Sequence, residues 1–254
     1  MYDLLKGRLQ FSAISTFNDP FEARPRYVPV SDNAGEQREA IIRYLADISP
    51  GGGSGTARRK WAEEAIRGKS MREIVETHER NSRGEHWIAT TQVLCLMTSQ
   101  AATKPLAWAH YADGHRGICA HLRTDIGPLR FAYPVDYQQE YPEVPVPRTA
   151  IDQWELVRRI LLRKSPDWSY EHEHRVIRIM LSDAGASHHL MTEWDGDVAI
   201  APKDIVTAVT VGCRMRVADR ERLMAWIKAN TPHIEVWQAT LHDSRYELGR
   251  ERIA

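Results

Sequence analysis

The chain has 254 residues, of which 34 are Lys or Arg and 34 are Asp or Glu. The chain therefore has no overall excess of basic or acidic residues, and its net charge does not indicate a nucleic-acid or membrane partner. A local basic patch is still compatible with this composition. The hydrophobic share of 43% and the charged share of 27% are ordinary for a soluble globular protein. No signal peptide or apolar run of membrane-spanning length is visible, which predicts a cytoplasmic protein without a membrane partner.

The N-terminal third is predicted to be mainly helical. A helical turn at residues 3–7, a strand at residues 8–12 and a loop at residues 15–22 come first. Apolar residues at helical spacing then predict helices over residues 34–48 and 56–82. The glycine-rich stretch between them, residues 51–55, is expected to be a flexible turn.

From residue 90 onward, short apolar runs predict strands with few helices between them. Strands are expected at residues 93–97, 117–122, 129–135, 171–181, 198–200, 206–211 and 234–241. Helices are expected at residues 106–113, 151–163 and 218–230. Because strands and helices do not alternate regularly, the pattern predicts an α+β fold rather than a doubly wound sheet. We expect a single domain over residues 1–254, with residues 34–86 as a helical insertion within it.

The three cysteines are widely spaced and lie in apolar runs. They are Cys95, Cys119 and Cys213, and no Cys-x-x-Cys motif is present. We therefore expect buried free thiols in a reducing compartment. A chain of this length can bury enough surface to fold without disulfides or metals.

The loop Phe17-Asn18-Asp19-Pro20-Phe21-Glu22 is the first candidate for a functional segment. Asn and Asp side chains in such loops often bond the neighbouring backbone, which is a structural role. The functional interpretation is that Asn18, Asp19 and Glu22 face a cleft while the two phenylalanines anchor the loop. The sequence leaves both interpretations open.

Aromatic and basic residues are crowded between Pro105 and Gly117. Trp108 and Tyr111 are three residues apart and share one helix face, a spacing that is usual for core residues. His110, His115 and Arg116 lie in the same segment. Aromatic rings beside a guanidinium would also suit stacking on a planar ring and pairing with a phosphate.

The stretch Glu171-His172-Glu173-His174-Arg175 is the strongest candidate. If it starts a strand, Glu171, Glu173 and Arg175 lie on one face, where Arg116 would be a natural partner for the acids. The structural interpretation is an ion network, because buried charges need partners. The functional interpretation is that a carboxylate stabilises a developing cation or binds a sugar hydroxyl. His172 and His174 face the other way, and a metal site is not favoured because no third ligand is located.

Several segments together resemble the bacterial domain of unknown function 2971 family. The matching pieces, in the order of the family, are Leu9–Ser12, Phe17–Glu22, Val93–Leu96, Trp108–Gly117 and Trp168–Arg175. Members of that family begin with a further Lys/Tyr-rich strand. The start at Met1-Tyr2-Asp3 is therefore expected to be shortened relative to the family.

A looser resemblance links the chain to ADP-ribosyltransferases, through a polar first strand, a Tyr-bearing helix and a late strand carrying Glu171-x-Glu173. It implies NAD as substrate, Tyr111 stacking on nicotinamide, and Glu173 or Glu171 binding the ribose and stabilising the oxocarbenium. The further NAD-contacting positions that it implies are Asn18, Asp19, Trp108, His110, Arg116 and Arg175. The implied role is a toxin or phage-defence effector, with an acceptor protein or nucleic acid and an antitoxin as partners.

Two other functions stay open at this point. Asp19, Glu22, Glu171 and Glu173 could surround a divalent metal in a hydrolase or nuclease, since carboxylate oxygens suit Mg²⁺ or Mn²⁺. The polar motifs could instead be structural, in a non-catalytic binding module.

Overall fold

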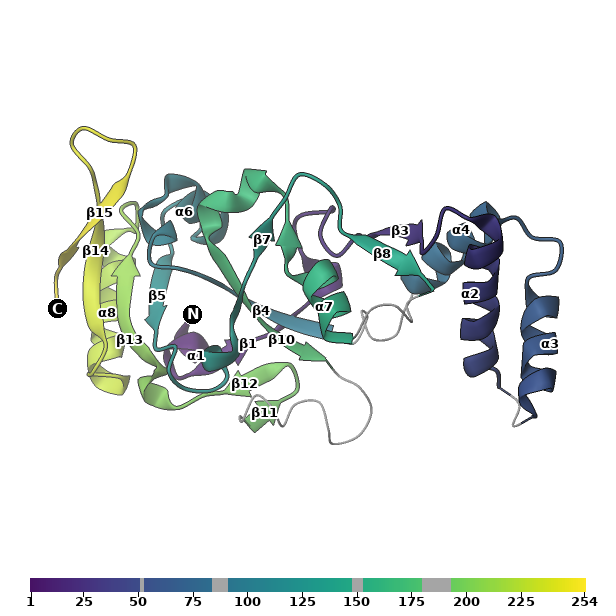
Figure 1. Ribbon diagram of the computed structural model, residues 1–254. Helices are drawn as coiled ribbons and strands as arrows, with labels where there is room; N and C mark the ends of the chain where they lie inside the picture. Colours follow the sequence, from purple (N-terminus) through teal and green to yellow (C-terminus); the bar gives the residue numbers. More distant parts are fainter. Residues whose placement is uncertain (51–52, 84–90, 148–152, 180–192) are drawn as a thin grey trace. The chain divides into compact units, whose positions relative to one another are not determined.

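The computed structural model describes residues 1–50, 53–83, 91–147, 153–179 and 193–254 (Figure 1). It confirms the α+β class, with helix over 38% of the chain and strand over 28%, arranged in several sheets. Contacts between Cα atoms divide the chain into two compact units. The first comprises Met1–Asn18, Thr90–Tyr137 and Ser165–Ala254, and the second comprises Asp19–Ala89 and Gln138–Lys164. The expected helices of residues 34–82 fall in the second unit.

The first unit is built from three sheets. The first sheet has the order β1 (Arg8–Gln10), β12 (Val198–Ile200), β11 (Glu193–Asp195). The second has the order β2 (Ser12–Ala13), β4 (Thr91–Met97), β10 (Glu173–Ile179), β6 (Tyr133–Pro134). The third has the order β15 (Leu248–Arg252), β14 (Glu235–Leu241), β13 (Val206–Val211), β5 (Ile118–Leu122). Within these sheets only β13 and β14 pair in parallel, and the helix α8 (Val217–Asn230) connects them, as a parallel pair requires.

A buried apolar cluster joins these sheets to α8 and to the short α1 (Tyr2–Leu5). Its members include Leu5, Phe11, Val176, Val209 and Leu223, each at most 1% exposed. Phe11, Val176 and Val209 come from three separate segments. The core therefore depends on all of them packing at once.

Short helical elements complete the first unit. They are the α-helix α6 (Pro105–Tyr111) and the 3₁₀ turns η1 (Ile14–Thr16), η2 (Ala101–Thr103), η3 (Leu129–Phe131), η5 (Pro166–Glu171) and η7 (Lys203–Ile205), beside the short β7 (Asp136–Tyr137). The start of α6 follows from Pro105 at its first turn, where no backbone N–H is needed.

The second unit consists of two parallel strands and several helices. The strand β3 (Arg26–Pro29) pairs with β8 (Glu143–Val146), and the helices are α2 (Ala34–Asp47), α3 (Gly55–Ala65), α4 (Met71–Arg83) and α7 (Gln153–Leu161), with the short β9 (Arg163–Lys164). Ile41, Ile42, Ala62, Ile66 and Ile74 form its helical core.

The expected helix over residues 56–82 is wrong in one respect, because it is two helices. α3 ends at Ala65, and Gly68 adopts a left-handed conformation (φ 73°) that suits glycine. α4 then starts at a capping box, in which the Ser70 hydroxyl accepts from the Glu73 N–H and the Glu73 carboxylate accepts from the Ser70 N–H.

Other expectations also need correction. Residues 129–135 are not one strand but η3 followed by β6. The strand expected at residues 171–181 begins only at Glu173, and residues 180–181 lie outside the described residues, as do residues 84–86 and 151–152. β15 was not expected, because its largely exposed residues give no apolar run. Cys95 is exposed rather than buried, and Cys119 and Cys213 are half-buried.

Within the described residues, we find no helix that is both long and apolar enough to cross a membrane.

Candidate functional site

A tyrosine on α6 and a buried acid at the end of η5 form the centre of the candidate site. The Tyr111 hydroxyl donates a hydrogen bond of 2.6 Å to Glu171 Oε1. Glu171 is 1% exposed, whereas Tyr111 is 49% exposed. A hydrogen bond from a neutral hydroxyl to an ionised carboxylate is stronger than a hydrogen bond between two neutral groups. The tyrosine ring is therefore held in a defined position while part of it stays accessible.

Glu173 and Arg175 form a second, separate contact at the start of β10. Arg175 Nε donates to Glu173 Oε1 at 2.8 Å, and Nη2 donates to Glu173 Oε2 at 3.0 Å. Their side chains are 3% and 2% exposed, and they share one strand face because they are two residues apart. The Arg175 guanidinium also lies 5.3 Å from the centre of the Phe17 ring. These two hydrogen bonds offset part of the cost of burying the two charges away from water.

The expected strand face that carries all three charges is wrong. Glu171 ends a 3₁₀ turn, and His172 has a left-handed backbone (φ 46°) before the strand begins. The chain therefore turns between the two acids. Glu171 contacts Tyr111, whereas Glu173 contacts Arg175 and donates its N–H to the Tyr137 hydroxyl at 2.8 Å.

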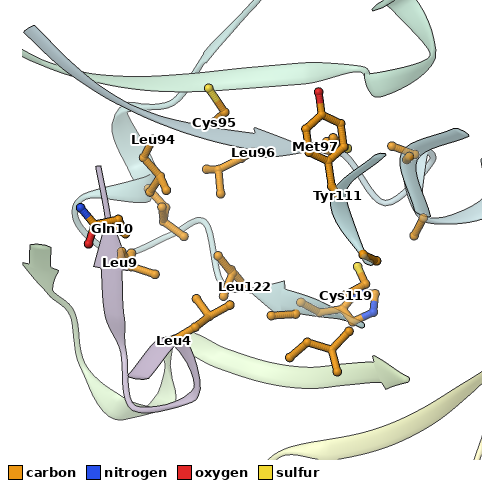
Figure 2. A pocket seen from close by; sticks show the side chains of 18 of the residues that line it. Leu4, Leu9, Gln10, Leu94, Cys95, Leu96, Met97, Tyr111, Cys119 and Leu122 are labelled. Atoms are coloured by element: carbon orange, nitrogen blue, oxygen red, sulfur yellow. The ribbon is translucent and has the colours of Figure 1, made fainter. Parts of the chain in front are cut away.

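Tyr111 lies in the wall of a cavity of about 860 Å³ within the first unit (Figure 2). Side chains from α1, β1, β4, α6 and β5 line it, and leucines predominate among those labelled in Figure 2. Thr98 and Ser99, which follow β4, border the same cavity. A volume of this size lies in the range of about 300–1,000 Å³ that small-molecule sites occupy.

A smaller hollow of about 310 Å³ lies next to the buried ion pair. It is lined by Thr98, Ser99, Gln100, Pro134, Val135, Tyr137, His172, Glu173 and His174. Thr98 and Ser99 border both spaces. Glu173 thus lines the smaller hollow. Glu171 lines neither space, but its carboxylate accepts a hydrogen bond from Tyr111, which lines the larger cavity.

The polar side chains on β5 that face the cavity are uncharged at neutral pH. Burial raises the pKa of the Cys119 thiol, so the thiol form predominates. Burial, and then the positive charge of Arg250, lower the pKa of His121. His121 Nε2 lies 2.8 Å from the Thr210 hydroxyl oxygen and 3.1 Å from Arg250 Nη1. This wall of the cavity therefore presents neutral groups to a ligand.

The other predicted residues of α6 and the turn after it have separate roles. Trp108 is buried, lines the cavity and donates its indole N–H to the Ala102 carbonyl at 2.8 Å. His110 Nδ1 lies 2.8 Å from the Tyr170 hydroxyl oxygen, so it links α6 to η5.

Arg116 does not pair with Glu171 or Glu173. It pairs with Asp113 at the surface, and this contact holds the pKa of Asp113 below its usual value.

The loop around Asp19 supports the structural interpretation. Asn18 is exposed and belongs to the first unit, whereas Asp19 and Glu22 belong to the second. Asp19 is buried, and its Oδ1 accepts the Phe21 N–H at 2.9 Å, which is the turn geometry expected of an aspartate in such a loop. Glu22 forms a buried ion pair of 3.1 Å with Lys164.

Sequence reasoning missed Thr98, Tyr137 and Lys164. A hydroxyl residue directly after the apolar run of β4 was the only available signal for Thr98. Tyr137 and Lys164 reach their partners from distant parts of the chain, which periodicity does not reveal. Among the described residues, no group of three or more His, Cys, Asp or Glu side chains is arranged to hold a metal ion.

Comparisons with known proteins identified no relative of this chain. No protein-family model, curated protein or solved structure matches this chain. The resemblance to the domain of unknown function 2971 family therefore stays a prediction.

Proposed function

We propose that this chain is an ADP-ribosyltransferase-like enzyme that uses NAD as a substrate. One observation supports it above the others: the Tyr111 ring is partly exposed at a large cavity while its hydroxyl is bonded to the buried Glu171. A ring held in this way can stack on a planar cationic ring such as nicotinamide. The nearby carboxylates can favour positive charge that develops on the ribose.

The proposed reaction breaks the bond between the nicotinamide nitrogen and the ribose carbon of NAD. The bond electrons leave with nicotinamide, which becomes neutral, and positive charge develops on the ribose. A nucleophile of the acceptor then bonds to that carbon and releases a proton to solvent. Preorganised negative charge near the ribose lowers this barrier because it interacts more strongly with the transition state than with NAD itself.

Each residue has a distinct role in this proposal. Tyr111 stacks on nicotinamide, and Glu171 holds that tyrosine by its hydrogen bond. Glu173, which lines the smaller hollow, binds a ribose hydroxyl through its carboxylate. Arg175 is thus a positioning residue for Glu173 in this proposal, and not itself a residue that contacts NAD.

A non-catalytic binding module is the second candidate, and one observation favours it. Glu173 and Arg175 satisfy each other through two hydrogen bonds, which a purely structural ion pair would also do. The two functions differ in their products. A binding module leaves NAD intact, whereas the proposed enzyme releases nicotinamide.

The test is calorimetry with NAD on the full chain, together with chromatographic detection of nicotinamide and a growth assay for cellular toxicity. Glu173→Gln should abolish nicotinamide release, and Tyr111→Ala should weaken NAD binding by about tenfold through loss of stacking. Tyr246→Phe, at a fully exposed position, is the matched control. Absence of NAD binding by the folded wild-type protein would overturn the proposal.

A further inference from the structure

An arginine on the last strand of the third sheet is held by side chains from the other three strands. The Arg250 guanidinium carbon, on β15, lies 4.6 Å from the centre of the Trp237 ring on β14. Arg250 Nη1 donates to His121 Nε2 on β5 at 3.1 Å, and the Thr210 hydroxyl oxygen on β13 lies 2.8 Å from the same His121 nitrogen. These contacts fix the position of the guanidinium on one face of the sheet.

His121 connects this arginine to the large cavity, because His121 is one of the residues that line the cavity. Arg250 is not itself in the lining, but its positive charge acts on the same wall. It adds to the effect of burial in lowering the pKa of His121, and it opposes the effect of burial on the pKa of Cys119, which is labelled in Figure 2. A positive charge therefore lies directly next to a wall of neutral groups.

One edge of the Arg250 guanidinium is available to a ligand. Its Nη1 contacts His121, and in the part of the chain that the structure describes no carboxylate pairs with the Nε and Nη2 edge. In Arg175 the same edge donates two hydrogen bonds to the Glu173 carboxylate. This edge of a guanidinium matches the oxygens of a carboxylate or a phosphate.

The opposite side of the cavity is less suited to an anion. Figure 2 shows Leu4 and Gln10, from α1 and β1, across the space from Cys119. The charged side chains that α1 and β1 contribute to the lining are Asp3, which is negative, and Arg8, which pairs with Asp195 at 2.6 Å. An anionic group of a ligand is therefore favoured at the His121 wall.

We propose that Arg250 binds the pyrophosphate of NAD beside His121. This inference rests on the proposed function and supplies a contact that it lacks, because Arg116 and Arg175 are paired with acids. Cys119 packs against α6, which carries Tyr111, and His121 lies about 7 Å farther along β5. A ribose separates nicotinamide from the pyrophosphate in NAD, so the two groups meet different parts of the wall.

The test is calorimetry on the full chain with NAD, inorganic pyrophosphate and nicotinamide riboside, which has no phosphate. Arg250→Gln, at an exposed position, should weaken NAD and pyrophosphate by at least about tenfold and leave nicotinamide riboside unchanged. Arg250→Lys keeps the charge but not the two parallel N–H groups, so its affinity for pyrophosphate should be intermediate. Arg252→Gln is the matched control, because Arg252 is on the same strand and pairs with Glu235 at 3.2 Å.

The outcomes separate this inference from the proposed function. If the wild-type protein binds NAD and releases nicotinamide, but Arg250→Gln binds NAD equally tightly, the role of Arg250 alone is overturned. Equal weakening of nicotinamide riboside by Arg250→Gln, or of pyrophosphate by Arg252→Gln, would also overturn it, because neither effect is specific to this contact. Absence of NAD binding by the wild-type protein overturns both.

Discussion

The carboxylate of Glu173 and the guanidinium of Arg175 are joined by two hydrogen bonds, at 2.8 and 3.0 Å, although both side chains are almost completely buried. The two residues are separated by only one position on β10. The strand itself therefore brings them together, and no long-range contact is needed to form the pair.

Breaking this pair from one side should be strongly destabilising. Arg175→Met leaves a buried carboxylate without its charged partner, and we expect a loss of about 3–5 kcal/mol in the free energy of unfolding. The double change Glu173→Met with Arg175→Met should be less harmful than the single change, because the buried charge of Glu173 is removed together with that of Arg175. Urea denaturation followed by tryptophan fluorescence measures both. A double variant that is less stable than Arg175→Met would contradict this account.

The Tyr111 hydroxyl should contribute to stability as well as to the site. Tyr111→Phe keeps the ring but removes a donor from the buried Glu171, which should lower the free energy of unfolding by about 1–2 kcal/mol. Tyr246→Phe removes a hydroxyl at a fully exposed position and should have no measurable effect. Equal stability of the two variants in urea would show that the bond to Glu171 contributes nothing.

His121 should make stability depend on pH. Burial and Arg250 lower its pKa in the folded protein below the ordinary value of 6.5, so the unfolded chain binds this proton more readily. The contribution is fully present above pH 6.5 and decreases as the pH falls through 6.5 toward the lower folded value. Urea midpoints between pH 5 and 8 should therefore fall less steeply toward acid in His121→Gln. Identical pH dependence in both proteins would rule out this role of His121.

Gly212 should tolerate no side chain. It directly follows β13, its N–H donates to the Gly117 carbonyl at 2.9 Å, and an added β-carbon would overlap the His115 carbonyl oxygen. We expect Gly212→Ala to lower the free energy of unfolding by at least about 2 kcal/mol, because backbone must move to make room. Gly55→Ala, at the start of α3 with open space around it, serves as the comparison and should be neutral or slightly stabilising. Thermal unfolding of the two variants separates these outcomes.

Local patterns in the sequence predicted most of the elements that form the first unit. The strands at β12, β13 and β14 and the helix α8 were expected from short apolar runs and helical spacing. The capping box of Ser70 and Glu73 was not expected, because the apolar spacing on either side of it suggested one continuous helix. The exposed residues of β15 offered no such pattern.

The candidate site shows the same difference between features that local sequence patterns predict and features that depend on long-range contacts. The sequence alone determined that acids, an arginine and an aromatic helix were present, and the two-residue spacing of Glu173 and Arg175 was enough to place them on one strand face. Only the tertiary structure decided that Glu171 turns away from that face to meet Tyr111, 60 positions earlier in the chain, at the wall of a cavity. The physical reason is that spacing governs contacts within one strand or helix, whereas contacts between distant segments depend on how all the buried apolar side chains pack together.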